Sequence, residues 1–292
     1  MGMAPGGVAG VTGTGLSQFH ELAEYYDPLN DQKDYRGESE RLETIARRFG
    51  RAGKTAWLDV ACGTGRHLEF LGQKHSTAGV DGSREMLRIA RRRLPGVRLV
   101  PGDMRTFRLN LRFDVVSCLF SAIGHLRTKQ EVQQAFANFA RHLNPGGVAI
   151  VEPWIEPSVF RSEFIDLRTY ESRALTVARC AYSSRRGNRS IIRYHFLVGK
   201  PGHDIRYYEV TDVGLLITRR ALLNLMRRAG LRAHFLARGL TSGRGLLVGV
   251  KGRAEEGLRP ARSSRSAMGR GRPLLRARGS RGRVLSSGRG AL

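Results

Sequence analysis

The sequence predicts a doubly wound α/β fold, in which a mainly parallel sheet carries an inserted antiparallel β lobe. Apolar runs alternate with amphipathic helical stretches through the first half of the chain, as in repeated β-α units. The runs at 113–120 and 148–151 are apolar without alternation, which is typical of strands covered by helices on both faces. Beyond these runs the pattern changes to strands in which apolar and polar residues alternate, so an antiparallel lobe is expected there.

Two amphipathic helices precede the first predicted strand. Residues 17–27 place apolar side chains at helical spacing until Pro28, and a second predicted helix, residues 34–50, ends at Gly50 or Gly53. The β-α alternation follows, with predicted strands at 56–60, 77–81, 97–104, 113–120 and 146–154 and predicted helices at 66–73, 84–94 and 131–143. The short connections favour a single doubly wound sheet.

The predicted antiparallel lobe spans residues 155–212. Arg186, Gly187 and Asn188 form its expected hairpin turn. The remaining predicted elements are a helix at 218–230 and strands at 233–238 and 243–251.

The chain carries a formal charge of +25, which is distributed unevenly. Residues 253–292 hold eleven arginines and two glutamates among mostly Gly, Ser and Ala, so this tail is expected to be disordered. The Gly-rich residues 1–16 are expected to be mobile, which leaves residues 17–252 as the folded domain. The charge outside the tail fits either a GC-rich genome that favours arginine or an anionic substrate. The tail itself is suited to weak, nonspecific contact with nucleic acid.

The sequence also indicates a cytoplasmic protein. No apolar run is long enough to span a bilayer, and the first residues lack the pattern of a signal peptide. Cys62, Cys118 and Cys180 lie in apolar stretches, and their odd number fits buried reduced thiols rather than disulfides. No pair of cysteines has metal-ligand spacing, so no metal site is expected.

A glycine turn and an acidic residue predict a cofactor pocket. Gly63 and Gly65 follow a buried strand, and glycines there let the backbone approach a ligand where a Cβ would clash. Asp81, at the end of the next strand, is suited to accept hydrogen bonds from both hydroxyls of a ribose. Leu68 occupies the position of the third glycine of a dinucleotide fingerprint, which disfavours a pyrophosphate cofactor. S-adenosylmethionine (SAM) has a sulfonium and no phosphate, so it fits this turn.

Four further residues complete the predicted cofactor site. Asp59 and Ala61 belong to the same strand and turn as the glycines. Asp103, after the third strand, is expected to reach the adenine amino group, with Met104 against the ring. Taken singly, these features have structural explanations as well: a bare turn for the glycines and a helix N-cap for Asp81.

The motifs DVACGTG, GDM and NPGG, together with Asp81, resemble the successive motifs of class I SAM-dependent methyltransferases. Over residues 21–251 the chain is also similar to the N,N-dimethyltransferases that act on nucleotide-linked amino sugars. The segments LDVACGTGRHLEFL, PGDMRTFRL, LFSAIGHL, VEPW, SSRRGN and SGRGLLVGV carry this resemblance. It implies a Rossmann-like sheet with an antiparallel lobe, a cytosolic homodimer, and a dTDP-3-amino or dTDP-4-amino deoxyhexose as the acceptor, methylated twice.

Three residues are candidates for contact with the acceptor sugar. The unperturbed pKa of His125 suits removal of the ammonium proton, and this residue either acts as a base or only orients the sugar. Glu152 is expected to bind a sugar hydroxyl or the amine, unless it forms a buried ion pair. Trp154 is either a stacking wall or part of the core.

Arginines are expected at the pyrophosphate because guanidinium groups form bidentate hydrogen bonds. Arg179, Arg185 and Arg244 are the candidates, and the family pattern favours Arg179 and Arg244. Tyr26 and Tyr35 match family tyrosines that close over the pocket and meet the amino-acid end of the cofactor; packing between helices is the alternative role for both.

Two departures from the family and two alternative functions stay open. Gln18 stands where the family has an active-site tyrosine, whereas Asp81 keeps the carboxylate of the family's ribose glutamate. The acceptor could instead be another small amine or hydroxyl compound. The alternative of a different class is a nucleic-acid-binding protein that uses the basic tail. Against a nucleic-acid methyltransferase, CLFSAIGH stands where an NPPY-like tetrapeptide would be needed.

Overall fold

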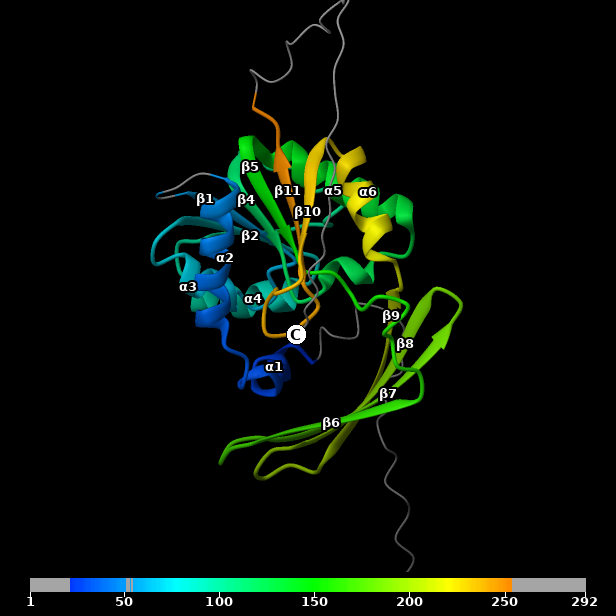
Figure 1. Cartoon of the computed structure of the whole chain (residues 1–292). Helices are drawn as coiled ribbons and strands as arrows, with labels where there is room; N and C mark the ends of the chain where they lie inside the picture. Colours follow the sequence, from blue (N-terminus) through cyan, green and yellow to red (C-terminus); the bar gives the residue numbers. More distant parts are fainter. Residues whose placement is uncertain (1–21, 51–52, 54, 254–292) are drawn as a thin grey trace, which may run out of the picture. The chain divides into compact units, whose positions relative to one another are not determined.

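A seven-stranded, mostly parallel sheet and a separate four-stranded antiparallel sheet form the described part of the chain (Figure 1). The computed structural model describes residues 22–50, 53 and 55–253, which belong to one unit of the chain. The predictions for the glycine-rich start, for Gln18 and for the arginine-rich tail lie outside the described residues.

The large sheet has the strand order β10-β11-β5-β4-β1-β2-β3. Its strands are β1 (Ala56–Val60), β2 (Ser76–Asp81), β3 (Arg98–Pro101), β4 (Phe113–Cys118), β5 (Leu143–Val151), β10 (Leu231–Leu236) and β11 (Leu246–Lys251). β1 to β5 pair in parallel, whereas β11 is antiparallel to both β5 and β10. The predicted fold class is confirmed. The strand order reverses between β1 and β4, and ligands bind at the carboxyl ends of strands beside such a reversal.

Helices cover both faces of this sheet, because successive strand residues point to opposite sides. The long helices are α2 (Tyr35–Phe49), α3 (Arg66–Leu71), α4 (Arg84–Arg93), α5 (Lys129–His142) and α6 (Arg219–Arg228). In β1, Trp57 packs in one apolar cluster with Leu42 of α2, and its neighbour Leu58 packs in another with Phe136 of α5. This two-sided burial explains why the strand sequences are apolar without alternation.

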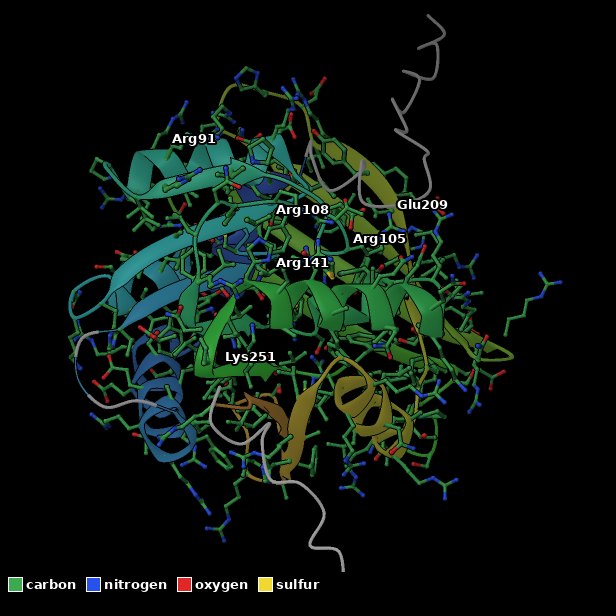
Figure 2. The ribbon with its side chains drawn as sticks, turned by 90° about the horizontal axis from the view of Figure 1, so that it is seen from above. Arg91, Arg105, Arg108, Arg141, Glu209 and Lys251 are labelled. Carbon is green, nitrogen blue, oxygen red and sulfur yellow. The ribbon has the colours of Figure 1, made fainter. Side chains whose placement is uncertain are left out.

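Basic side chains stabilise the carboxyl end of α5. Lys251 Nζ donates to the carbonyl oxygens of Ala140 and Leu143 at 2.7 and 2.8 Å, and Arg112 donates to that of Arg141 at 3.1 Å. Figure 2 shows Arg141 on this helix and Lys251 near its end. Cations there satisfy carbonyls that lack an intrahelical partner and interact favourably with the helix dipole. Part of the basic charge is therefore structural.

The antiparallel sheet packs one face against the N-terminal helix α1 (Ala23–Tyr26). Its strands, in sequential order, are β6 (Phe164–Glu171), β7 (Thr176–Arg186), β8 (Arg189–Gly199) and β9 (Arg206–Leu215). The predicted hairpin turn joins β7 to β8, with Gly187 at a φ of 60°. Leu22 and Tyr25 share a buried cluster with Val177, Phe196 and Val210 of the sheet.

Three details differ from the sequence predictions. β5 begins at Leu143, so the NPGG turn lies inside the strand as an irregularity in its pairing with β4. β3 ends at Pro101, which leaves Asp103 and Met104 in a loop. The prediction of buried cysteines was wrong for Cys180, because strand alternation turns its side chain to the outer face of β7, where it is exposed. Within residues 22–50 and 55–253, no helix is long and apolar enough to cross a bilayer.

Candidate functional site

The loop after β1 adopts a left-handed backbone at three positions. Ala61, Gly63 and Gly65 have φ values of 59°, 55° and 80°. A Cβ at Gly65 would also lie 2.7 Å from Leu94 Cδ1, so any larger residue there would require the Leu94 side chain to move. A Cβ at Gly63 would meet no atom within 4 Å, so this glycine leaves open space beside the backbone.

Asp81 lies directly beside this loop. Its Oδ2 accepts a hydrogen bond from the Gly63 N–H at 2.7 Å, and its Oδ1 accepts one from the Ser83 N–H at 2.8 Å. The carboxylate therefore fixes the turn and remains half-buried at the end of β2, next to the space left by Gly63. This geometry suits a carboxylate that binds the hydroxyls of a ribose.

A cavity of about 30 Å³ brings five predicted cofactor residues together. They are Tyr26, Tyr35, Asp59, Ala61 and Gly63. Phe120, from the loop after β4, closes the cavity with its ring centroid 6.1 Å from that of Tyr26. SAM is much larger than this volume, so the wall of the cavity must move to admit it.

The polar groups at this cavity fit SAM. The Tyr35 hydroxyl is buried and has no hydrogen-bond partner among the described residues, so it can bind the amino-acid end of the cofactor. Burial raises the pKa of Asp59 to about 6, and a hydrogen bond from Ser117 at 2.7 Å holds its carboxyl group. With Asp81, these groups provide hydrogen-bonding partners for a cationic ligand that has no phosphate.

Asp103 and Met104 are not among the residues that line this cavity. Asp103 forms a bidentate ion pair with Arg105, and hydrogen bonds from Arg105 lower its pKa. Arg105, labelled in Figure 2, also donates to Glu131 at 2.6 Å. Contact between Asp103 and an adenine therefore remains a prediction.

His125 forms a pair with Asp212 across the two sheets. It ends the short 3₁₀ helix η3 (Ala122–His125) after β4, and its Nδ1 lies 3.1 Å from Asp212 Oδ1 on β9. Because a carboxylate only accepts hydrogen bonds, Nδ1 carries the proton and Nε2 is the basic nitrogen. Burial alone would lower the His125 pKa, but the hydrogen bond and charge of Asp212 outweigh it and raise the pKa.

Glu152 is fully buried after β5 and holds two loops together. Its Oε2 accepts from the Phe120 N–H at 2.6 Å, and its Oε1 accepts from the Ser242 hydroxyl. The loop between β10 and β11, residues 237–245, is thereby joined to the loop after β4. Both hydrogen bonds engage the carboxylate within the protein.

Trp154 and Arg244 line a second, larger cavity of about 520 Å³. The Arg244 guanidinium lies 4.9 Å from the centroid of a Trp154 ring and donates to the Ser121 hydroxyl at 2.7 Å. Trp154 donates from Nε1 to the Ser190 hydroxyl at 2.9 Å. Arg219 also lines this cavity, which is large enough for part of a nucleotide.

The other two candidate arginines lie elsewhere. Arg179 donates to Asp166 on the inner face of the antiparallel sheet, and its guanidinium lies 5.1 Å from the Tyr194 ring centroid. Arg185 donates hydrogen bonds to the carbonyl oxygens of Pro157 and Gly187 at 2.9 and 2.8 Å. Neither arginine lines the larger cavity.

Comparison with known proteins identifies the family. Residues 58–147 match a methyltransferase domain. The dTDP-3-amino-3,6-dideoxy-alpha-D-glucopyranose N,N-dimethyltransferase of Streptomyces fradiae is 41% identical over 235 residues, which cover 80% of this chain and 91% of that protein. The chain belongs to the dTDP-amino-sugar N,N-dimethyltransferases. It is therefore a SAM-dependent methyltransferase.

Solved structures of sugar methyltransferases have the same fold. The crystal structure of Streptomyces venezuelae DesVI matches with a TM-score of 0.74 and 39% identity, covering 80% of this chain and 98% of DesVI. SAM-bound CalS10, an amino pentose methyltransferase from Micromonospora echinaspora, matches with a TM-score of 0.71 and 34% identity over 79% of this chain and 96% of that chain. Both matches extend over nearly the whole of the related chain.

Sequence reasoning missed Asp212 in this methyltransferase. Its partner His125 lies 87 residues earlier, and only the folded arrangement of the two sheets brings them together. The signal available in the sequence was an acidic residue on a strand whose other inward positions are apolar or aromatic, such as Tyr208 and Val210.

Replacement of Asp81 is expected to weaken SAM binding. Asp81→Ala removes the acceptor for the ribose hydroxyls and for the Gly63 N–H, and hydrogen bonds to a charged group contribute about 1.5–3 kcal/mol each. Isothermal titration should give a dissociation constant for SAM at least about tenfold higher, which corresponds to about 1.4 kcal/mol. Asp81→Asn keeps one oxygen for the Gly63 N–H, so its dissociation constant for SAM should lie between those of the wild type and Asp81→Ala. Unchanged affinity in Asp81→Ala would contradict this role.

Proposed function

We propose that this protein transfers methyl groups from SAM to the amino nitrogen of a dTDP-linked amino deoxysugar. The similarity to three relatives named for such acceptors, at 34–41% identity over 91–97% of their lengths, supports this acceptor class. The observation that carries the proposal is the His125–Asp212 pair at the carboxyl edge of the sheet, where a basic nitrogen can serve an amine acceptor. We also propose that residues 17–252 act as the catalytic domain of a cytoplasmic enzyme.

The chemistry requires a neutral amine aligned with the methyl carbon. SAM supplies, when bound, a methyl group activated by its sulfonium. His125 Nε2 accepts the proton that the ammonium form of the acceptor must lose, while Asp212 fixes the ring and stabilises the resulting imidazolium. Alignment of the amine in the site supplies most of the remaining acceleration, and no covalent intermediate is needed.

The larger cavity is suited to the nucleotide end of the acceptor. Trp154 offers an aromatic face, and Arg244 a guanidinium for the pyrophosphate. Burial lowers the pKa of both Arg179 and Arg244, and the nearby Tyr194 acts on both in the opposite direction. We propose Arg179, which pairs with Asp166 on the antiparallel sheet and does not line the larger cavity, as a second guanidinium for the pyrophosphate.

Product analysis tests the acceptor class. The full-length chain incubated with SAM and dTDP-3-amino or dTDP-4-amino deoxyhexoses should give a monomethylated and then a dimethylated product, followed by mass spectrometry. If SAM binds and no isomer is methylated, the proposed acceptor class is wrong.

The pH dependence of the reaction tests His125 and Asp212. His125 must be neutral to accept a proton, so kcat/KM should fall as the pH drops below its pKa. Asp212→Asn removes the charge that raises this pKa, so the acidic limb of the profile should move to lower pH. His125→Ala should lower kcat about 100-fold and abolish that limb, in line with ordinary general base catalysis.

The exposed carboxylate of Asp204 provides the matched control for this profile. Asp204→Asn should leave the acidic limb unchanged, because Asp204 lies before β9 and is not part of the His125–Asp212 pair. An acidic limb that stays at the wild-type pH in Asp212→Asn argues against His125 as the base.

We further propose that the enzyme is a homodimer that associates through the outer face of the antiparallel sheet. Ile165, Leu167 and Leu197 on this face are 63%, 65% and 52% exposed, and strand alternation puts them on one surface.

The tail at 253–292 supplies charge for weak, salt-dependent contact with nucleic-acid phosphates, which truncation after Lys251 would abolish.

Charged substitutions on the outer face of the antiparallel sheet are expected to separate the subunits. The wild-type protein should elute with the mass of two chains in light-scattering chromatography, and the double variant Leu167→Glu, Leu197→Glu with the mass of one, because burial of two carboxylates in an apolar interface is unfavourable. Leu111→Glu is the control, since Leu111 is 45% exposed in the loop before β4. A wild-type mass of one chain contradicts the proposed dimer.

A further inference from the structure

Glu38 is a buried carboxylate with partners on three separate segments. It lies in the first turn of α2 and is almost completely inaccessible to solvent. Its Oε2 pairs with His67 Nε2 at 2.8 Å, and its Oε1 accepts from Lys33 Nζ at 2.5 Å. The same Oε1 accepts from the Thr241 N–H at 3.2 Å and from the Thr241 hydroxyl.

These partners keep Glu38 ionised. Burial by itself would raise its pKa, but the hydrogen bonds from His67, Lys33 and Thr241 outweigh that effect and lower the pKa to about 2. The charge therefore persists throughout the physiological pH range. A buried charge that keeps such partners constrains their relative positions strongly, because loss of any one leaves it less well compensated.

One partner of Glu38 lines the cofactor cavity, and a second contacts a residue of its wall. His67 lines that cavity beside Tyr35, with the ring centroids 5.0 Å apart. Lys33 Nζ lies 4.9 Å from the ring centroid of Phe120, which closes the cavity. Any change in the wall on cofactor binding therefore acts directly on the donors to Glu38.

The third partner, Thr241, lies in the loop between β10 and β11, which lines the larger cavity. Thr241 is followed by Ser242, which donates to Glu152, and by Arg244, which lies against Trp154. Two buried carboxylates thus hold adjacent residues of one loop. Glu38 itself is not among the residues that line either cavity.

We propose that Glu38 is a positioning residue that couples the two cavities, so that binding in the cofactor cavity organises residues 241–244 of the loop between β10 and β11 for the nucleotide of the acceptor. This inference rests on the proposed function. The cofactor cavity is small, so a ligand must shift its wall, and the bonds from His67 and Lys33 through Glu38 to Thr241 transmit that shift. Coupling of this kind is reciprocal, so the nucleotide strengthens cofactor binding by the same factor.

Glu43 provides a matched comparison on the same helix. It is also buried, and it also pairs with a lysine and a histidine, Lys74 at 3.0 Å and His75 at 3.6 Å. Its partners lie outside both cavities. Glu43→Gln therefore reproduces the loss of a buried charge on α2 without interrupting the connection between the cavities.

Isothermal titration of dTDP, with and without saturating S-adenosylhomocysteine, measures the coupling. In the wild-type enzyme, saturating S-adenosylhomocysteine should lower the dissociation constant of dTDP at least about fivefold, which is within the ordinary range of coupling between sites. In Glu38→Gln and in Thr241→Val the two affinities should agree within about twofold, whereas Glu43→Gln should keep the wild-type factor. Thr241→Val removes only the hydroxyl donor and keeps the Glu38 carboxylate with its His67 and Lys33 partners, so it tests the connection at the loop.

The possible failures are distinguishable. Wild-type coupling retained in both Glu38→Gln and Thr241→Val would overturn the inference, as would a wild-type enzyme that binds both ligands independently. A Glu43→Gln variant that loses coupling equally would also overturn it, because the effect would then belong to α2 in general. Absence of methylated product or of dTDP binding in the wild type would instead count against the proposed function.

Discussion

The relative position of the two sheets depends on how Trp154 packs between two glycines. A Cβ on Gly124 would lie 2.7 Å from the Trp154 Cβ, and a Cβ on Gly214 would lie 2.9 Å from its Nε1. Gly124 precedes His125, and Gly214 lies two residues beyond Asp212 on the same face of β9. The close approach of the indole to both backbones therefore sets the distance between the proposed base and its carboxylate. Trp154 therefore packs between the two sheets and also lines the larger cavity.

The turn after β4 illustrates a second constraint. Phe120 and Ser121 are both left-handed, with φ values of 51° and 62°, a conformation that costs about 1–2 kcal/mol per residue without glycine. Glu152 compensates by accepting the Phe120 N–H, since a hydrogen bond to a charged group contributes about 1.5–3 kcal/mol. The Ser121 hydroxyl donates to the Pro153 carbonyl at 2.7 Å. The strained turn directs the Phe120 ring over the cofactor cavity, so Glu152 shapes the site through the backbone.

Local patterns in the sequence were sufficient for most of the fold and for the cofactor loop. Strands, helices and the glycine turn each depend on residues close in the chain, which is why they were predictable. Polar pairs between distant segments have no such signal: Glu38 and Thr241 are 203 residues apart, and Glu152 and Ser242 are 90 apart. Glu152 was predicted to reach the sugar from its place at the end of a strand, and its hydrogen bonds to Phe120 and Ser242 had no signal in the sequence.

Carboxylates gather around Tyr26 at the cofactor cavity. Asp59 lines that cavity, and after burial and Tyr35, the acidic neighbours Asp27, Asp81 and Glu152 contribute to the raised pKa of Tyr26. These carboxylates attract the ammonium group of an acceptor, whereas Arg244 in the larger cavity suits its pyrophosphate. The same field that attracts the ammonium also disfavours its loss of a proton, which is why a base held by its own carboxylate is needed there.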